Sequence, residues 1–371
     1  MAGPERQDQP PEPAGSRRRD SAAGQRSPHN PPPGTSSAAS EWPGVSLIVD
    51  GRDAAAAQAM VAELLVDPYP GDFEIIVATP ATSDTETAAS DTETATVGPA
   101  AATDQRVITV HARDASGAVL VNAAASAASY PILSVVRQPA GDWIRLVKRA
   151  VTAMDVTGAA VVGGSAVAVG LGSAEMAISR AMNSRLGVGP RPSRVGAAKG
   201  PVDSVRMVVI QRDAFARAGG FDPAFAGAPG WEMQHRVRRL GGMVWLDPAL
   251  AVRGRVPGTI SELAATFFRM GVWRRRIIGA HPDTSTWRYL VPPTLVAVLV
   301  GTVLGGLAGA VLGVGWMAWL TASCLIYALG VAVGVMVAGR DLRFGGRVRM
   351  WWAVMVIHLS WGTGFLFGRP R

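Results

Sequence analysis

The chain has 371 residues and a formal net charge of +8, with 48% hydrophobic and only 17% charged residues. A soluble globular protein usually carries about 25% charged residues. No Asp, Glu, Lys or Arg occurs from Tyr289 to Gly339, so the composition excludes a purely soluble protein. Everything before Trp287 lacks an apolar run of membrane length, which excludes a polytopic transporter.

The N-terminal residues 1–42 are rich in Pro, Gly and Ser and mix both signs of charge. This composition predicts a disordered tail, and no apolar stretch typical of a signal peptide occurs in it. The single cysteine, Cys324, excludes an intrachain disulfide and a cysteine-based zinc site. The five histidines show no metal-ligand spacing, so we expect no dedicated histidine metal site.

Residues 43–258 alternate short apolar runs with Ala-rich or amphipathic stretches, which predicts an α/β domain built on a mostly parallel sheet. The expected strands are Val45–Val49, Phe73–Val77, Val107–Val110 and Ile132–Val136, and the expected helices include Ala54–Leu65 and Ala118–Ala128. In such sheets the ligand lies at the carboxyl ends of the strands. A duplicated Ser-Asp-Thr-Glu-Thr-Ala within residues 83–98 predicts a low-complexity loop without chemistry.

Residues 259–288 have apolar residues at helical spacing from Ile260 to Phe268, followed by Arg274–Arg276. This pattern predicts a basic amphipathic helix that lies in the membrane interface. The alternative is a helix packed only on the α/β domain. The excess of arginine in this half of the chain suits lipid headgroups or a diphosphate. No nucleic-acid-binding motif accompanies the charge, so nucleic acid is not an expected partner.

Residues 289–368 predict three transmembrane helices, near 291–312, 316–338 and 350–368. A buried helical hairpin is the alternative for the first two. Clustered arginines precede the first span and separate the second from the third, so we expect both segments, and with them the α/β domain, in the cytoplasm. The chain then crosses the plasma membrane three times. The C-terminus is then outside, and Arg369 and Arg371 weakly oppose this orientation.

A series of short motifs follows in order. They are VGG at Val162–Gly164, GPVDSV at Gly200–Val205, AGGFDPAF at Ala218–Phe225, WEMQHRVRRLGGMVWLDP at Trp231–Pro248, FFRMGVWRRR at Phe267–Arg276, RYLVPP at Arg288–Pro293 and HLSWGTGFLFG at His358–Gly368. Together they resemble bacterial family 2 glycosyltransferases of the membrane-anchored succinoglycan-biosynthesis type. The resemblance covers roughly residues 43–368 and is strongest from residue 160 onward.

The resemblance implies a GT-A fold that transfers a sugar from a nucleotide-sugar donor to a lipid-linked or polysaccharide acceptor. It also implies Mg²⁺ or Mn²⁺ on the leaving diphosphate, held by a D-x-D pair. A carboxylate near the acceptor hydroxyl would act as the base.

The chain departs from this pattern where the metal is expected. The D-x-D position falls on Ser134–Val136, and no Asp or Glu occurs in Ala123–Gly141. Asp142 is the nearest acid, at an expected helix start where a carboxylate favours capping. We therefore assign no metal ligand.

The expected base position is Gly230, which leaves Glu232 as the candidate base. Its alternative role is an i,i+4 ion pair with Arg236 on the helix surface. Asp84 and Asp203 are candidates for donor binding, and Arg269 and Trp273 match the acceptor-side motif, with Thr266 in place of its Gln. Asp222, after two glycines, is expected to stabilise a turn.

Two hypotheses follow. The first is an active glycosyltransferase that binds a nucleotide sugar and a lipid-linked glycan. The second is a catalytically inactive membrane subunit that binds a partner glycosyltransferase or a glycolipid. The missing D-x-D and base carboxylates leave the enzymatic activity undecided between them.

Overall fold

The computed structural model describes residues 42–66, 68–81, 104–114, 116–136, 143–189 and 198–369. The chain divides into two compact units, Met1–Ala39 and Ser40–Arg371, and all described residues belong to the second. The predicted tail (apart from Trp42), the 83–98 loop, Asp84 and Asp142 lie outside the described residues.

The main sheet has eight strands in the order β3-β2-β1-β4-β8-β5-β9-β7. Its first four strands are parallel and match the predicted runs: β1 Val45–Asp50, β2 Phe73–Pro80, β3 Val107–Ala112 and β4 Ile132–Val136. The other half contains β5 Val161–Gly164, β7 Gly200–Pro201, β8 Arg206–Gln211 and β9 Val244–Leu246, of which β8 is antiparallel to both β4 and β5. A separate ribbon pairs β6 Ala166–Val169 with β10 Val252–Arg255.

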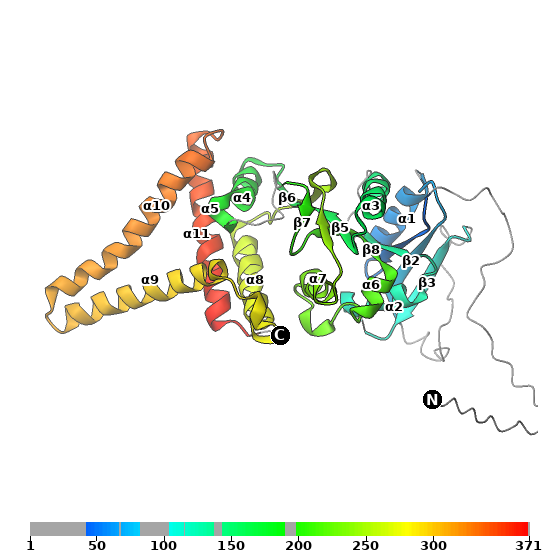
Figure 1. Ribbon diagram of the computed structural model, residues 1–371. Coiled ribbons are helices and arrows are strands. Elements are labelled where there is room, and N and C mark those ends of the chain that lie inside the picture. The colour runs from blue at the N-terminus through cyan, green and yellow to red at the C-terminus, as the bar shows by residue number, and fades with distance from the viewer. Residues whose placement is uncertain are drawn as a thin grey trace, which may run out of the picture. The chain divides into compact units, whose positions relative to one another are not determined.

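Helices cover both faces of this sheet (Figure 1). The helices α1 Ala54–Val66 and α3 Trp143–Thr157 share one apolar cluster with Val45, Leu47 and Val49. The helices α2 Gly117–Ala127, α6 Arg212–Arg217 and α7 Pro229–Arg239 share the opposite cluster with Ile48. Because both faces are buried, the strands are continuously apolar, as parallel strands usually are. The predicted mostly parallel α/β sheet is confirmed.

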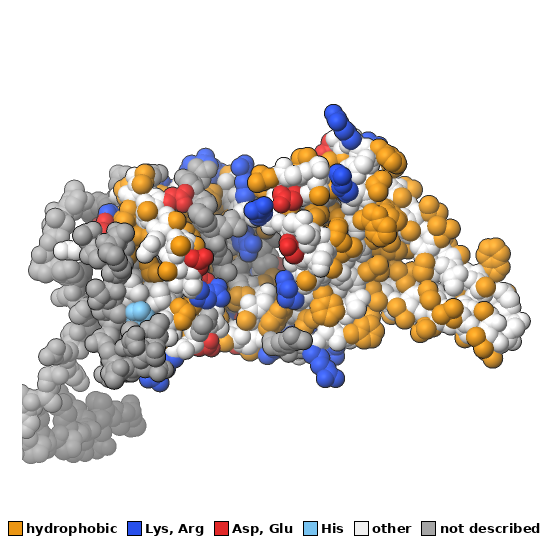
Figure 2. Space-filling view, turned by 180° about the vertical axis from the view of Figure 1, so that it is seen from behind, with side chains coloured by type: hydrophobic (Ala, Val, Ile, Leu, Met, Phe, Trp, Pro, Cys, Tyr) orange, Lys and Arg blue, Asp and Glu red, His pale blue; other side chains and the backbone are white. Residues whose placement is uncertain are grey.

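Among the described residues, three helices are long and apolar enough to cross a membrane. They are α9 Trp287–Val311, the continuous segment of η5 Gly315–Thr321 with α10 Ala322–Ala338, and α11 Phe344–Phe367. Hydrophobic side chains dominate the surface of this part, whereas charged side chains gather over the α/β part (Figure 2). The first two helices match the predicted spans closely. The third begins earlier than predicted, at Phe344, and its first turns include Arg347 and Arg349, which donate to Arg340 O and Ser173 Oγ.

The predicted amphipathic segment forms α8 Ile260–Ala280, and it packs lengthwise along α11 (Figure 1). Glycines make this contact close. A Cβ atom at Gly364 would collide with Phe268 O, and one at Gly271 would collide with Trp361 O. Small residues of this kind let two helix backbones approach. The sequence pattern predicted the helix but not its partner.

We expect Gly364→Val to destabilise the second unit by about 1–3 kcal/mol, because the new side chain meets backbone that cannot move aside easily. Gly330→Val in α10 is the matched control, since a Cβ there meets nothing within 4 Å. Thermal unfolding in detergent would measure both. Equal unfolding temperatures for the two variants would contradict the close α8–α11 contact.

Candidate active site

A cavity of about 1080 Å³ lies between the α/β domain and the membrane-length helices. The start of β8 and the first turn of α7 form one wall, and α8, α9 and α11 form the other. The second wall presents apolar side chains such as Trp273, Leu295 and Trp361. A water-soluble ligand and an apolar chain could therefore meet in one space.

The charged groups that line this cavity are mostly cationic. Among the described residues, Asp203 is the one carboxylate in its wall, against the guanidinium groups of Arg185, Arg206, Arg274 and Arg288. Arg274 lies over the rings of Trp231 and Tyr289, at 4.5 and 3.9 Å from their centroids. Guanidinium groups bind phosphate oxygens in a planar, two-pronged geometry. The cavity is thus suited to a phosphate-bearing anion.

Gly230 lines the cavity from the first turn of α7. The position where the resemblance places a catalytic base therefore does face the cavity, but it has no side chain to offer. Glu232, two residues further on, is not among the lining residues of this cavity. The helix turns it away, because positions two apart point to different sides.

Glu232 is instead buried in an ion pair. Its Oε1 accepts from Arg236 Nε at 2.7 Å and its Oε2 from Nη2 at 2.6 Å. Arg236 also donates to Ala218 O and to Gly220 O, within a turn where Gly219 and Gly220 both have positive φ. The structure therefore contains the i,i+4 pair of the alternative role, but buried and not on the helix surface as predicted, because Arg236 also binds the turn after α6.

Two further polar side chains, those of Asp222 and Asn122, also bond backbone groups of this turn. Asp222 Oδ1 accepts from Ala224 N at 2.8 Å, so the expected turn role is confirmed. On α2, Asn122 bonds both backbone groups of Phe221, at 2.7 and 2.8 Å.

The two acceptor-side candidates separate in space. Trp273 lines the cavity and packs directly on Gly227, where a Cβ atom would collide with the indole ring. Arg269 is exposed, does not line the cavity, and donates a weak 3.4 Å hydrogen bond to Thr266. Arg269 lies one helical turn before Trp273 on α8, and of the two only Trp273 reaches the cavity.

The expected D-x-D position is part of the sheet core. Ser134 is fully buried in β4, where its hydroxyl donates to Val208 O at 2.8 Å and accepts from Trp143 Nε1 at 3.1 Å. Within the part of the chain that the structure describes, no group of three or more His, Cys, Asp or Glu side chains could hold a metal ion. These residues do not fit a cation held by a carboxylate pair.

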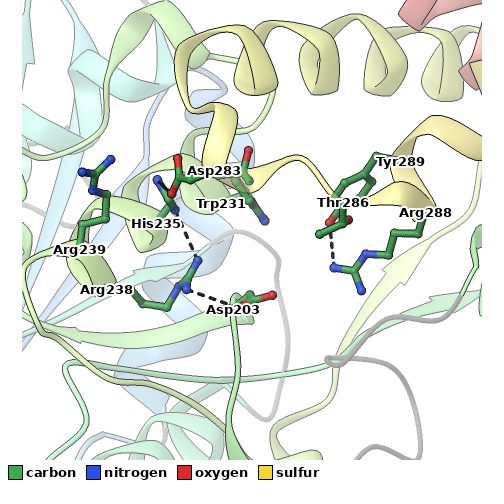
Figure 3. Close-up of a pocket in the computed structure, with 10 residues that line it drawn as sticks. Asp203, Trp231, His235, Arg238, Arg239, Asp283, Thr286, Arg288 and Tyr289 are labelled. Carbon is green, nitrogen blue, oxygen red and sulfur yellow. Dashed lines mark hydrogen bonds and ion pairs between the residues drawn. The ribbon is translucent and has the colours of Figure 1, made fainter.

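A smaller pocket of about 240 Å³ adjoins the cavity and shares Asp203 with it (Figure 3). Asp203 Oδ1 is 3.4 Å from Arg238 Nη1, and Arg238 Nη2 is 3.4 Å from His235 Nδ1. His235 Nε2 is 3.5 Å from Asp283 Oδ2. These contacts form a polar chain from the cavity wall to the segment after α8.

His235 also stacks on Trp231, and its ring centroid is 4.9 Å from that of His281. His281 Nε2 in turn is 3.3 Å from Glu232 Oε1. The histidines are scattered in the sequence, because α7 and the end of α8 are far apart along the chain. Only the fold brings them together.

The chain thus combines an α/β sheet of the mostly parallel type, a cation-lined cavity and helices of membrane length. No family model matches the chain. It is 25% identical over 203 residues to the succinoglycan biosynthesis protein ExoA of Rhizobium meliloti (strain 1021). The match covers 53% of this chain and 57% of that protein, so the chain spans only a little over half the length of this curated relative.

Two solved structures are more distant. The mannosyltransferase PcManGT from Pyrobaculum calidifontis, in complex with GDP-Man and Mn²⁺, is 13% identical with a TM-score of 0.49, covering 89% of this chain and 88% of that chain. Residues 1–349 of S. aureus TarS, in complex with UDP, are 12% identical with a TM-score of 0.40, covering 62% and 64%. Both TM-scores lie below 0.5. The relation to ExoA supports a family 2 glycosyltransferase of the ExoA-like type, which confirms the resemblance seen in the motifs.

We expect Glu232→Ala to lower the free energy of unfolding by about 3 kcal/mol, because it leaves the Arg236 guanidinium without its carboxylate. Glu63→Ala on α1, which removes a carboxylate that is only half-buried, is the matched control. Thermal unfolding should separate the two by several degrees. A Glu232→Ala protein of unchanged stability that had lost sugar transfer would restore Glu232 as the base.

Burial lowers the pKa of His235 below its ordinary 6.5, against the opposing attraction of Asp283, while His281, Arg238 and Arg239 lower it further. The folded protein therefore favours neutral His235, and the unfolded chain binds more protons below pH 6.5. Stability from this residue is complete above 6.5 and declines as the pH falls below it. His235→Phe should weaken that decline while keeping the stack on Trp231.

Unfolding temperatures of the two proteins, measured from pH 7.5 down to pH 5, test this sign. Parallel curves for the variant and the unaltered chain would show that His235 does not contribute to the acid destabilisation.

Proposed function

We propose that this chain is a membrane-anchored glycosyltransferase of the hexosyltransferase type. It transfers a sugar from a nucleotide diphosphate donor to a lipid-linked or polysaccharide acceptor at the cytoplasmic face of the plasma membrane. The observation that carries the proposal is a cavity that brings four arginine side chains together with apolar side chains of the membrane-length helices. The sequence relation to ExoA supports the same chemistry.

The donor diphosphate is expected beside the four arginines of the cavity, of which Arg274 belongs to α8 and Arg288 to α9. Arg185, Arg206, Arg274 and Arg288 together offset the negative charge that develops on the leaving group as the sugar departs. A divalent cation is the usual device for this purpose in the family. The described residues do not fit a divalent cation, so the arginines are the groups that we propose for this role.

The acceptor is expected along the apolar side chains of α8, α9 and α11. The indole of Trp273 offers an apolar face for a sugar ring, and Leu295 and Trp361 provide apolar surface for the lipid chain next to it. Arginines on both sides of the hairpin formed by α9 and α10 favour a cytoplasmic α/β domain.

Asp203 is the proposed proton acceptor, as the one carboxylate among the described residues that line the cavity. It takes the proton of the acceptor hydroxyl while the oxygen bonds to the sugar carbon and the nucleoside diphosphate leaves with the electron pair of the broken bond. Its Oδ1 lies 3.4 Å from Arg238 Nη1, a contact that holds the carboxylate at the cavity wall.

A catalytically inactive subunit, which binds a glycolipid or a partner glycosyltransferase, is the second candidate. The observation that favours it is Gly230, which faces the cavity at the expected base position without a functional group. The two candidates share the same ligand chemistry and differ only in turnover.

We expect Asp203→Asn to lower the rate of transfer by about 100-fold or more while nucleoside diphosphate binding is kept or tightened. The assay measures nucleoside diphosphate released from a panel of nucleotide sugars, using the full chain in vesicles with a bacterial membrane lipid extract. Asp155→Asn, an exposed carboxylate on α3, is the matched control.

Full turnover by Asp203→Asn would refute Asp203 as the base. No turnover by the unaltered chain, combined with calorimetric binding of a nucleotide sugar, would favour the inactive subunit.

A further inference from the structure

The helix α11 differs from the other two membrane-length helices in what surrounds it. In its most apolar stretch 39% of the residues are buried by protein, compared with 17% in α9 and 11% for the segment Gly315–Ala338. Besides α9 and α10, three helices from the part of the chain before the membrane helices pack against it. They are α4 Ser173–Asn183, α5 Arg185–Val188 and α8.

These contacts occur along the whole of α11. Near its start, Arg349 Nη1 donates to Ser173 Oγ at 3.2 Å. In its middle, His358 Nε2 lies 2.8 Å from Leu186 O. At its end, Arg275 Nη1 donates to Leu366 O at 2.9 Å. At 1.5 Å per residue, the first and last of these contacts are about 25 Å apart along the helix axis.

A hydrocarbon core is about 30 Å thick, so a crossing α11 would take its neighbours into the bilayer with it. Those neighbours are unsuited to hydrocarbon. They carry the charged side chains of Glu175, Arg180, Arg185, Arg269, Arg274, Arg275 and Arg276. Moreover, α4 and α5 are too short to span, and the connections at their ends would leave backbone groups unsatisfied in lipid.

We propose that α11 does not cross the membrane. It lies at the membrane surface between the α/β domain and the lipid, and only the hairpin of α9 and α10 crosses. The C-terminus therefore returns to the side of the α/β domain. This inference is independent of the proposed enzymatic function, because it rests on packing and charge alone.

The side of α11 that faces away from α8 fits a lipid surface. Phe344, Val348, Trp352 and Phe367 are exposed on it. In Figure 1 α9 and α10 extend from α11 on the side opposite the sheet, which continues the apolar surface into the hairpin. The far end of the hairpin exposes Leu312, Trp316 and Trp319, as expected for residues that reach the opposite interface.

The distribution of arginine agrees with this arrangement. With three crossings, Arg369 and Arg371 stand on the outer side and oppose the positive-inside tendency. With two crossings, they join Arg340 and Arg343 on the inner side. The hairpin from Tyr289 to Gly339 contains no Asp, Glu, Lys or Arg. With two crossings, all charged residues from Arg340 to Gly368 therefore lie on the inner side.

Cysteine labelling in sealed bacterial membrane vesicles of one orientation tests the proposal. Cys324→Ser gives a cysteine-free chain, since Cys324 is the single cysteine. Into it we would introduce, one at a time, Asp155→Cys on α3, Leu312→Cys at the hairpin tip and Arg369→Cys after α11, all at exposed positions. A membrane-impermeant maleimide then reports the side of each, with labelling in detergent as the reference for full reactivity.

We expect the cysteines at 155 and 369 to react from the same side and the one at 312 only from the other. Reaction of positions 312 and 369 from one side, opposite to 155, would establish three crossings and overturn the proposal. Reaction of 155 and 312 from the same side would overturn it as well, because the hairpin would then not cross.

Discussion

The close packing of α8 between α11 and the α/β domain is the constraint on which the site depends. On one side, Gly271 and Gly364 let the two backbones touch, since any larger side chain would collide with a carbonyl oxygen. On its other side, Trp273 packs directly on Gly227, ahead of α7. This double contact sets the width of the cavity and places Arg274 over Trp231.

The charge balance of the cavity follows from which side chains the fold turns inward. The first turn of α7 presents Gly230, while Glu232 turns back to Arg236. Both oxygens of the buried Glu232 carboxylate bind the Arg236 guanidinium, and His281 lies beside them. The carboxylate contributes to folding, because its removal leaves the Arg236 cation without its partner. The inward-facing anion is then Asp203, opposite several arginines, and this reversal suits a phosphate ligand better than a metal ion.

Burial by neighbouring helices also decides which of the membrane-length helices can cross the bilayer. By length and composition, α9, the segment Gly315–Ala338 and α11 could each cross a membrane. However, α11 contacts the charged helices before it at its start, middle and end. A helix held by such neighbours along about 25 Å cannot exchange them for lipid without carrying their charges along. An anchor of two crossings then supports a surface helix that also forms part of the cavity wall.

By itself, the sequence determined the elements that depend on local pattern. Continuous apolar runs specified the four parallel strands, the uncharged stretch specified the membrane-length helices, and the spacing of Glu232 and Arg236 allowed their pair. The tertiary structure alone decided which residues face one cavity. It brought Asp203 to Arg238, set His235 beside His281 and separated Trp273 from Arg269. The physical reason is that periodicity fixes which face of an element is apolar, whereas the partner of that face depends on packing between segments distant in the chain.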